Sequence, residues 1–317
     1  MIEVRNLTKF FGPTLAVDHV SFKVEKGEII GLLGPNGSGK TTIMRILTGF
    51  FPPTSGQALI GGLDVAEYSL QVRRRVGYLP ENMVLYPELT VTALLKFAAR
   101  VRGLDRAVAR ERIEFAIKTC GLGEVRKKLI GRLSKGYRQR AGIAQAILSD
   151  PEVLILDEPT VGLDPRQVIE IRDLIRSLAG RSTVLLSTHI LPEVNMTCRR
   201  VVIIDRGKIV ALDTPETLTA KLQGSEQTMV TVAGPREPVR NALLGVPQVQ
   251  RVEERPAESG ADGACTFMAF SQGGGDAVRA AIANQVVQRG WALLEIKPVA
   301  LSLEDLFVRL VTKEEGH

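Results

Sequence analysis

Cysteine is scarce in this protein, and the few cysteines are far apart. Cys120, Cys198 and Cys265 are the three cysteines among 317 residues, and none belongs to a C-x-x-C pair. A disulfide framework or a zinc site would need cysteines at short, paired spacing. The sequence therefore indicates neither kind of site, and we expect all three thiols to be buried structural groups.

Long apolar runs are also missing. No stretch approaches the ~18 consecutive apolar residues that a membrane-spanning helix needs. The beginning of the chain has no charged segment followed by an apolar core, so it lacks the pattern of a secretory signal peptide. With 44% hydrophobic residues the chain can still bury a sizeable core. We expect a cytoplasmic protein, long enough for two domains, that reaches a membrane only through a partner.

An excess of acidic residues is confined to one part of the chain. Residues 225–317 contain 9 Lys and Arg against 12 Asp and Glu, whereas residues 1–224 contain 32 against 23. A basic front part suits an anionic ligand and an acidic lipid surface, and it equally suits nucleic acid. The sequence lacks the interleaved basic and aromatic residues of RNA-binding surfaces, so we rank nucleic acid lower.

A glycine-rich stretch organises the chain. An apolar run of strand length, 29–33, precedes it, and a helical pattern begins directly after it. The stretch fits the pattern G-x-x-x-x-G-K-[ST] at every fixed position with Gly34, Pro35, Asn36, Gly37, Ser38, Gly39, Lys40 and Thr41, followed by Thr42. Strand, loop and helix in this order favour a phosphate site over a flexible Gly/Ser loop.

Each residue type in this stretch has a chemical reason. Glycines let successive backbone N–H groups point at an anion, and the following helix turns its positive end toward the same place. Lys40 supplies a full charge for the β- and γ-phosphates, and the Thr41 hydroxyl is the expected Mg²⁺ ligand. The stretch therefore predicts binding of a nucleoside triphosphate.

Strands and helices alternate through residues 1–222. Residues 2–30 are β-rich, and residues 90–148 form a helical insert in which Leu94, Phe97, Ala98 and Val101 repeat at helical spacing. Continuous apolar runs then predict buried strands at 153–156, 183–187 and 201–205. This alternation is typical of an α/β domain with a largely parallel sheet.

The composition changes near residue 224, and a second domain is expected at 225–317. Its pattern is β-α-β-β-α-β, which is typical of a small ferredoxin-like α+β domain. Ser302 to Asp305 then resembles a capping box that opens a last helix through Leu306, Phe307 and Leu310. No group of titratable residues stands out here, so we interpret this domain as an interaction or regulatory module.

Two adjacent acids end one of the buried strands. Asp157 is placed to hold Mg²⁺ directly or through water. Glu158 is a candidate general base that takes a proton from attacking water, a role worth about 10²–10⁴ in rate. Adjacent acids can also cap a helix, but a cap would not explain two acids beside a phosphate loop.

Three further features are weak when taken singly. Ser134 and Gly136 open a predicted helix, where a hydroxyl and a backbone N–H can bind an anion. Asp164 follows the two acids closely, in Gly162-Leu163-Asp164. His189 lies just after a predicted strand, where an imidazole could hydrogen-bond a γ-phosphate, although a lone histidine is more often structural.

Together and in this order, these residues resemble the ATP-binding cassette (ABC) ATPase family over residues 1–222. The resemblance implies a P-loop NTPase with a RecA-like core, a β-rich N-terminal subdomain and a helical insert. It implies that Phe11, for which core packing is the alternative, stacks on adenine, and that His189 is the switch histidine. It also implies a head-to-tail dimer around two ATP molecules, in which Ser134 and Gly136 contact the ATP of the opposite copy and Asp164 lies in the inter-subunit loop.

Two departures from the family pattern concern residues near the nucleotide. Glu81 stands where a glutamine is usual, and its carboxylate can still touch Mg²⁺ or its water. Lys135 and Tyr137 replace the first glycine and the glutamine of the signature motif, while Ser134 and Gly136 remain. Both departures resemble the branch of bacterial cassettes that serve six-helix export permeases, and the tail from Leu301 is similar to the C-terminal extension of that branch.

The resemblance implies the ATP-hydrolysing subunit of an ABC exporter with ATP and Mg²⁺ as cofactors. Its partners would be a second copy or a homologous cassette and a membrane permease, which would hold it at the inner face of the cell membrane. The permease contact is expected near Glu81–Thr90 and the helical insert. The alternative is a soluble ABC ATPase acting on ribosomes or DNA. Against it, the chain has one P-loop and no long coiled coil, and a regulatory GTPase would need an N-K-x-D motif that is absent.

Overall fold

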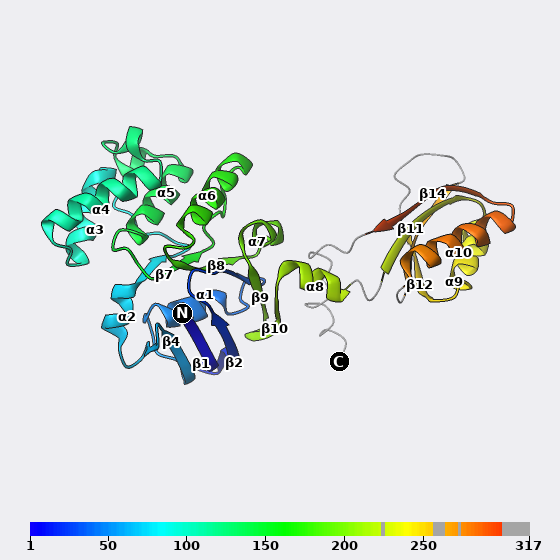
Figure 1. Ribbon diagram of the computed structural model, residues 1–317, viewed down its shortest axis with the longest axis horizontal. Helices are drawn as coiled ribbons and strands as arrows, with labels where there is room; N and C mark the ends of the chain where they lie inside the picture. Colours follow the sequence, from blue (N-terminus) through cyan, green and yellow to red (C-terminus); the bar gives the residue numbers. More distant parts are fainter. Residues whose placement is uncertain (223–225, 256–263, 272–273, 300–317) are drawn as a thin grey trace. The chain divides into compact units, whose positions relative to one another are not determined.

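The computed structural model describes residues 1–222, 226–255, 264–271 and 274–299. The chain divides into two compact units, Met1–Pro215 and Glu216–His317 (Figure 1). The domain boundaries expected from the sequence, 1–222 and 225–317, stay a prediction. Among the described residues, no helix combines the length and the apolar character that crossing a bilayer requires.

A largely parallel sheet forms the centre of the first unit. In its described part the sheet has six strands in the order β10-β9-β3-β8-β7-β6. Only β10 runs antiparallel to its neighbour among these described pairs. The strands are β3 (Ile29–Leu33), β6 (Val76–Leu79), β7 (Val153–Asp157), β8 (Thr183–Thr188), β9 (Arg200–Asp205) and β10 (Lys208–Asp213). Their apolar runs are buried on both faces, as the sequence predicts.

A second, antiparallel sheet covers helix α1 (Lys40–Leu47). It has the order β2-β1-β4-β5 and consists of β1 (Ile2–Phe11), β2 (Thr14–Val24), β4 (Ser55–Ile60) and β5 (Leu63–Asp64). Side chains from both sheets and from α1 form one core, in which Ile43, Met44, Ile46 and Leu47 are fully buried. The helix that follows the glycine-rich loop is therefore packed between two sheets, which fixes the position of the end of the loop that joins it.

The helical insert is present and lies together on one side of the unit (Figure 1). It comprises α3 (Val91–Val101), α4 (Arg106–Thr119) and α5 (Lys135–Ala146), with short 3₁₀ turns at Gly123–Val125 and Ile130–Arg132. The remaining helices of residues 1–222 are α2 (Ser69–Arg75), α6 (Pro165–Leu178), α7 (Leu191–Thr197) and α8 (Pro215–Leu222).

The helix expected from the spacing of apolar residues is present as α3, but two of those residues are exposed. Leu94 and Ala98 are buried, but Phe97 is 45% exposed and Val101 is 70% exposed. The ring of Phe97 lies against the edge of Tyr86, with 5.4 Å between the ring centres. Val101 lines an open groove. Helical spacing predicts the helix, but it does not tell whether each apolar side chain meets a neighbouring element.

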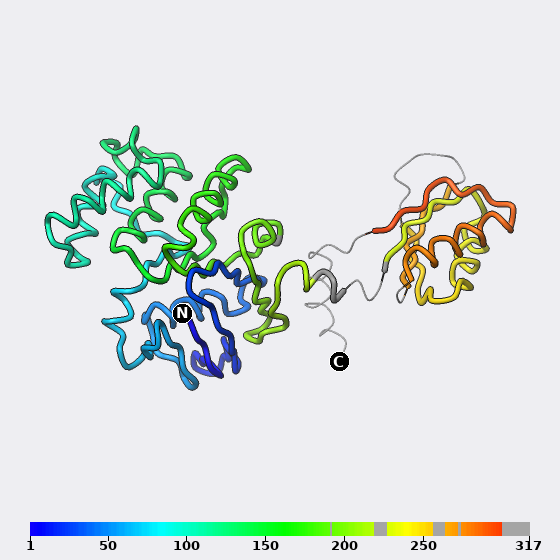
Figure 2. The backbone as a smooth tube through the Cα atoms, in the orientation of Figure 1, coloured from blue at the N-terminus to red at the C-terminus, as the bar shows by residue number. Residues whose placement is uncertain are grey.

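The second unit contains a four-stranded antiparallel sheet in its described part, in the order β12-β13-β11-β14. Along the chain its elements are β11 (Glu226–Ala233), α9 (Arg236–Leu244), β12 (Val249–Arg255), β13 (Ala264–Ser271), α10 (Gly275–Gln288) and β14 (Ala292–Val299). The two helices lie against the sheet (Figure 2). They pack on it through one apolar core. The helix expected after Ser302 lies outside the described residues. All three cysteines are free and buried, as expected.

Candidate active site

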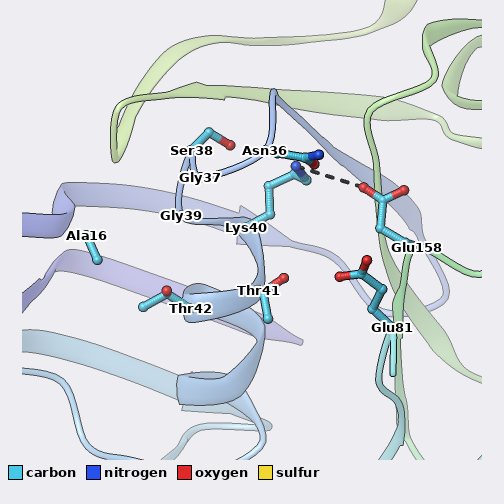
Figure 3. Close-up of a pocket in the computed structure, with 10 residues that line it drawn as sticks. All are labelled: Ala16, Asn36, Gly37, Ser38, Gly39, Lys40, Thr41, Thr42, Glu81 and Glu158. Carbon is cyan, nitrogen blue, oxygen red and sulfur yellow. Dashed lines mark ion pairs between the residues drawn. The ribbon is translucent and has the colours of Figure 1, made fainter. Parts of the chain in front are cut away.

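The glycine-rich loop joins β3 to α1, so the strand–loop–helix context expected from the sequence is confirmed. Gly39 has a backbone φ of +102°, and a Cβ on it would lie 2.6 Å from the carbonyl oxygen of Ala16. A side chain is excluded there both by conformation and by space. The loop lines a cavity of about 270 Å³ whose lining residues are Ala16, Asn36, Gly37, Ser38, Gly39, Lys40, Thr41, Thr42, Glu81 and Glu158 (Figure 3).

Lys40 lies across the loop and faces Glu158. Its side chain is 6% exposed, and its ammonium nitrogen is 3.9 Å from Oε1 of Glu158 (Figure 3). The same nitrogen donates hydrogen bonds to the carbonyl oxygens of Gly34 at 2.7 Å and Pro35 at 3.0 Å. Burial lowers the pKa of Lys40, and the negative charges of Glu158, Asp157 and Glu81 oppose that shift. A buried ammonium at a glycine-rich loop is suited to binding a phosphate.

Asp157 ends β7 directly beside the loop. It is buried, and its Oδ1 accepts hydrogen bonds from the hydroxyls of Ser187 at 2.5 Å and Thr41 at 3.4 Å. Its other oxygen, Oδ2, is buried and has no hydrogen-bond partner among the described residues. An unpartnered buried carboxylate oxygen beside a threonine hydroxyl fits Mg²⁺, which takes one or two carboxylates and substrate phosphates.

Glu158 is held in an unusual backbone conformation. Its φ is +50°, a value that non-glycine residues adopt at a cost of about 1–3 kcal/mol. Its N–H donates to the Ser187 hydroxyl at 2.9 Å, and its Oε2 lies 3.0 Å from Nδ1 of His189. The strained backbone turns the carboxylate toward the loop cavity, where Lys40 and Glu81 also lie.

Ser187 is a residue that motif reasoning missed. It is fully buried, and its one hydroxyl donates to Asp157 and accepts from the N–H of Glu158. Its signal in the sequence is a hydroxyl residue at the end of an apolar strand. That signal acquires meaning only because β8 is the neighbour of β7 in the sheet.

Replacing Ser187 with alanine tests this bridge. We expect Ser187→Ala to lower the free energy of unfolding by about 1–3 kcal/mol, because a buried donor–acceptor pair loses its partner. We also expect ATP hydrolysis to fall, since both acids lose a restraint. Ser182→Ala is the matched control, because Ser182 is a buried serine just before the opposite end of β8, and its hydroxyl donates to the Pro151 carbonyl at 2.7 Å. Equal hydrolysis in the two variants would contradict the assigned role.

Ser134, Gly136 and Asp164 line a different cavity of about 520 Å³, which shares no lining residue with the first. Ser134 caps α5 by accepting from the N–H of Tyr137, and Asp164 caps α6 by accepting from the N–H of Gln167. A Cβ on Gly136 would lie 2.7 Å from Oε1 of Gln167, so the helix start and the α6 start approach closely here.

Phe11 does not line the loop cavity. Its ring is half exposed and meets the edge of Phe51, with 5.3 Å between the ring centres. The ammonium of Lys9 lies over the same ring, 5.3 Å from its centre. The structure therefore brings together the loop, Asp157, Glu158, Glu81 and His189, and it places Phe11 and the second cavity apart from them. The roles assigned to all these residues stay predictions.

Known proteins share this architecture. A sequence profile described as "ABC transporter" matches residues 17–161. The "Probable multidrug ABC transporter ATP-binding protein YbhF" of Escherichia coli is 40% identical over 228 residues, which are 72% of this chain and 39% of YbhF. This chain thus spans less than half the length of that relative.

Two further matches extend over most of the other protein. The "Nod factor export ATP-binding protein I" of Cupriavidus metallidurans is 36% identical over 258 residues, which are 80% of this chain and 84% of the relative. A solved structure of an ATP-binding subunit of an ABC transporter is similar with a TM-score of 0.64 and 31% identity, over 70% of this chain and 93% of the other. The P-loop NTPase fold expected from the sequence is confirmed, and the chain belongs to the ABC transporter ATP-binding protein family.

Proposed function

We propose that this chain is the ATP-hydrolysing subunit of an ABC exporter. One observation carries the proposal: the loop cavity has Lys40 on one side and, across from it, Glu158, which is paired with His189. The loop and Lys40 suit a triphosphate. A carboxylate facing the same space suits the deprotonation of a water molecule.

The residues divide the reaction among them. The backbone N–H groups of residues 36–42 and the Lys40 ammonium bind the phosphates, and Phe11 stacks on adenine. Glu158 accepts a proton from water, whose oxygen then bonds to the γ-phosphorus as the bond to the β,γ-bridging oxygen breaks. The products are ADP and phosphate. His189 orients the Glu158 carboxylate and hydrogen-bonds the γ-phosphate.

Magnesium fits the residues at the end of β7. Thr41 and Asp157 would hold it, with Glu81 beside them, and the ion would neutralise charge on the β- and γ-phosphates. Among the described residues no group of three or more His, Cys, Asp or Glu side chains is arranged as a metal site. A site of one or two protein ligands completed by phosphates is the usual arrangement for Mg²⁺ with a nucleotide.

Two copies are needed for a complete site. Ser134, Gly136 and Asp164 surround a cavity separate from the phosphate loop of the same chain, so they do not reach its nucleotide. They present a hydroxyl, a backbone N–H and a helix start, which suit the phosphates of a nucleotide bound by another copy. A head-to-tail homodimer, or a dimer with a homologous cassette, would combine the two kinds of half-site.

The permease contact is proposed on exposed apolar surface near the helical insert. Val84, Tyr86 and Phe97 are exposed there. Beside α3 lies an apolar groove of about 640 Å³ that Phe50, Leu70 and Val101 line, together with Arg73, Arg74, Arg102 and neighbouring residues. An apolar groove with three arginines suits a short amphipathic helix that carries an acidic residue, exposed by the permease at the inner face of the cell membrane.

Co-purification tests this assignment. The chain and the membrane protein encoded beside it should be recovered together from solubilised membranes after co-expression. Leu70→Lys and Val101→Lys should reduce the recovered permease at least about tenfold, because a cation buried in an arginine-rich groove is repelled and desolvated. ATP binding should not change, since neither residue lines the loop cavity.

The matched control is Val108→Lys. Val108 is similarly apolar and exposed on α4 but does not line the groove. Equal recovery of permease with Leu70→Lys and Val108→Lys would show that the permease does not bind in the groove. Recovery of the parent chain only as a soluble protein would favour an ABC ATPase that acts on ribosomes or DNA.

A further inference from the structure

A buried hydrogen bond lies next to His189 of the candidate site. Thr188, the last residue of β8, is fully buried, and its hydroxyl donates to Oε2 of Glu193 at 2.9 Å. The same hydroxyl accepts from the N–H of Ile190 at 2.9 Å. One side chain thus ties together the residues on both sides of His189.

Glu193 is an unexpected residue to find buried. It lies in the first turn of α7, is 7% exposed, and has no ion pair with a basic side chain among the described residues. A buried carboxylate without a basic partner costs free energy, and an apolar residue of similar size would pack at less cost. Its bond with Thr188 therefore needs an explanation other than overall stability.

His189 supplies that explanation. Its ring is 44% exposed, so packing does little to hold it, yet its Nδ1 lies 3.0 Å from Oε2 of Glu158. The neighbouring backbone must then determine where the ring lies. That backbone is closed into a turn by the Thr188 hydroxyl and by the hydrogen bond from the Glu193 N–H to the Ile190 carbonyl at 3.2 Å.

We propose that Thr188 and Glu193 are positioning residues for His189. Their buried hydrogen bond holds the turn from 188 to 193 so that the imidazole meets the Glu158 carboxylate. Their action differs from that of Ser187, whose hydroxyl restrains Asp157 and the backbone of Glu158. The inference rests on the proposed hydrolytic function of Glu158 and His189.

Steady-state kinetics of the full chain tests the inference. Thr188→Val and Glu193→Ala each remove the hydrogen bond, and each should lower kcat for ATP hydrolysis about 10–100-fold, as loss of a supporting residue commonly does. The KM for ATP should stay within about twofold, because the phosphate loop is untouched. Thr188→Ser and Glu193→Gln keep a hydroxyl donor and an oxygen acceptor, and both should keep kcat within roughly threefold of the parent.

Thr183→Val is the matched control for a loss of stability alone. Thr183 is a buried threonine at the opposite end of β8, and its hydroxyl accepts from the N–H of Gly27 at 3.0 Å. It should lower the melting temperature as Thr188→Val does while keeping the parent kcat. The inference would be overturned if Thr188→Val and Glu193→Ala had the same kcat as Thr183→Val. It would also be overturned if the kcat of Glu193→Gln were no higher than that of Glu193→Ala.

ATP hydrolysis by Glu158→Gln tells whether the positioning role alone fails or the proposed function fails with it. If Glu158→Gln abolishes hydrolysis while Thr188→Val and Glu193→Ala hydrolyse ATP at the parent rate, the positioning role is wrong and the proposed function stands. If Glu158→Gln hydrolyses ATP at the parent rate, the proposed function fails, and the positioning role fails with it.

Discussion

Glu158→Gln is expected to abolish nearly all ATP hydrolysis while leaving ATP binding intact. Glutamine has the size and shape of glutamate, so the backbone at φ +50° and the bond from its N–H to Ser187 should persist. An amide cannot accept a proton from water at neutral pH, so phosphate release should fall about 10²–10⁴-fold. Because ATP is then retained, the two half-sites should stay closed around it as a stable dimer.

Two measurements follow this variant. Phosphate release reports the chemical step, and light scattering with and without ATP and Mg²⁺ should show the mass of a dimer only with the nucleotide. Glu152→Gln is the matched control, because Glu152 is an exposed glutamate that pairs with Arg75 away from the loop cavity. Hydrolysis at the parent rate in Glu158→Gln would show that another group is the base. A monomer in saturating ATP would count against the two-copy site.

Lys40→Ala has the second large expected effect, and it acts at an earlier step. The Lys40 ammonium is buried beside the loop carbonyls of Gly34 and Pro35 and close to Glu158. Alanine removes the full positive charge and leaves the Glu158 carboxylate facing the incoming phosphates. Losing a charged hydrogen bond costs about 1.5–3 kcal/mol, so ATP affinity should fall roughly 10–100-fold.

Calorimetric titration with ATP and Mg²⁺ measures this loss best in the Glu158→Gln background, where hydrolysis does not deplete the ligand. Lys23→Ala is the control, since Lys23 is an exposed lysine paired with Glu25. A thermal melt separates weaker binding from unfolding. If the double variant bound ATP as tightly as Glu158→Gln alone, Lys40 would have no part in phosphate recognition.

Removal of Mg²⁺ tests the proposed metal dependence and shows whether the Thr188 and Glu193 variants share it with the parent. Hydrolysis should stop in a chelator and return with added Mg²⁺, whereas the Thr188 and Glu193 variants should respond to Mg²⁺ as the parent does. Their bond spans His189 along the chain, from residue 188 to residue 193, and does not include a proposed metal ligand.

The phosphate loop could be predicted from the sequence because its chemistry is local. Consecutive residues from Gly34 to Thr42 form one turn between a strand and a helix, and glycine is required where Gly39 has positive φ. Asp157 and Glu158 were predictable for a related reason. Carboxyl ends of parallel strands meet at one edge of a sheet, so acids at the end of β7 lie near the loop that follows β3, two strands away.

The remaining features depend on which elements become neighbours. Ser187 reaches Asp157 because β8 pairs with β7, and spacing along the chain does not reveal that pairing. Phe97 and Val101 have the helical spacing of core residues, yet no element packs over them fully. The closeness of Glu158 to Lys40 likewise joins residues far apart in the chain across the sheet.

The sequence by itself determined the chemistry of the phosphate loop, the two acids beside it and the alternation of strands and helices, because each is encoded in neighbouring residues. Only the tertiary structure decided that Ser134 and Gly136 lie at a cavity of their own, and that the hydrogen-bonded side chains of Thr188 and Glu193 are buried next to His189. The physical reason is the same for both. Burial and hydrogen-bond partners are set by the order of strands in the sheet and by the helices packed against it, and residue type and local spacing do not specify that order.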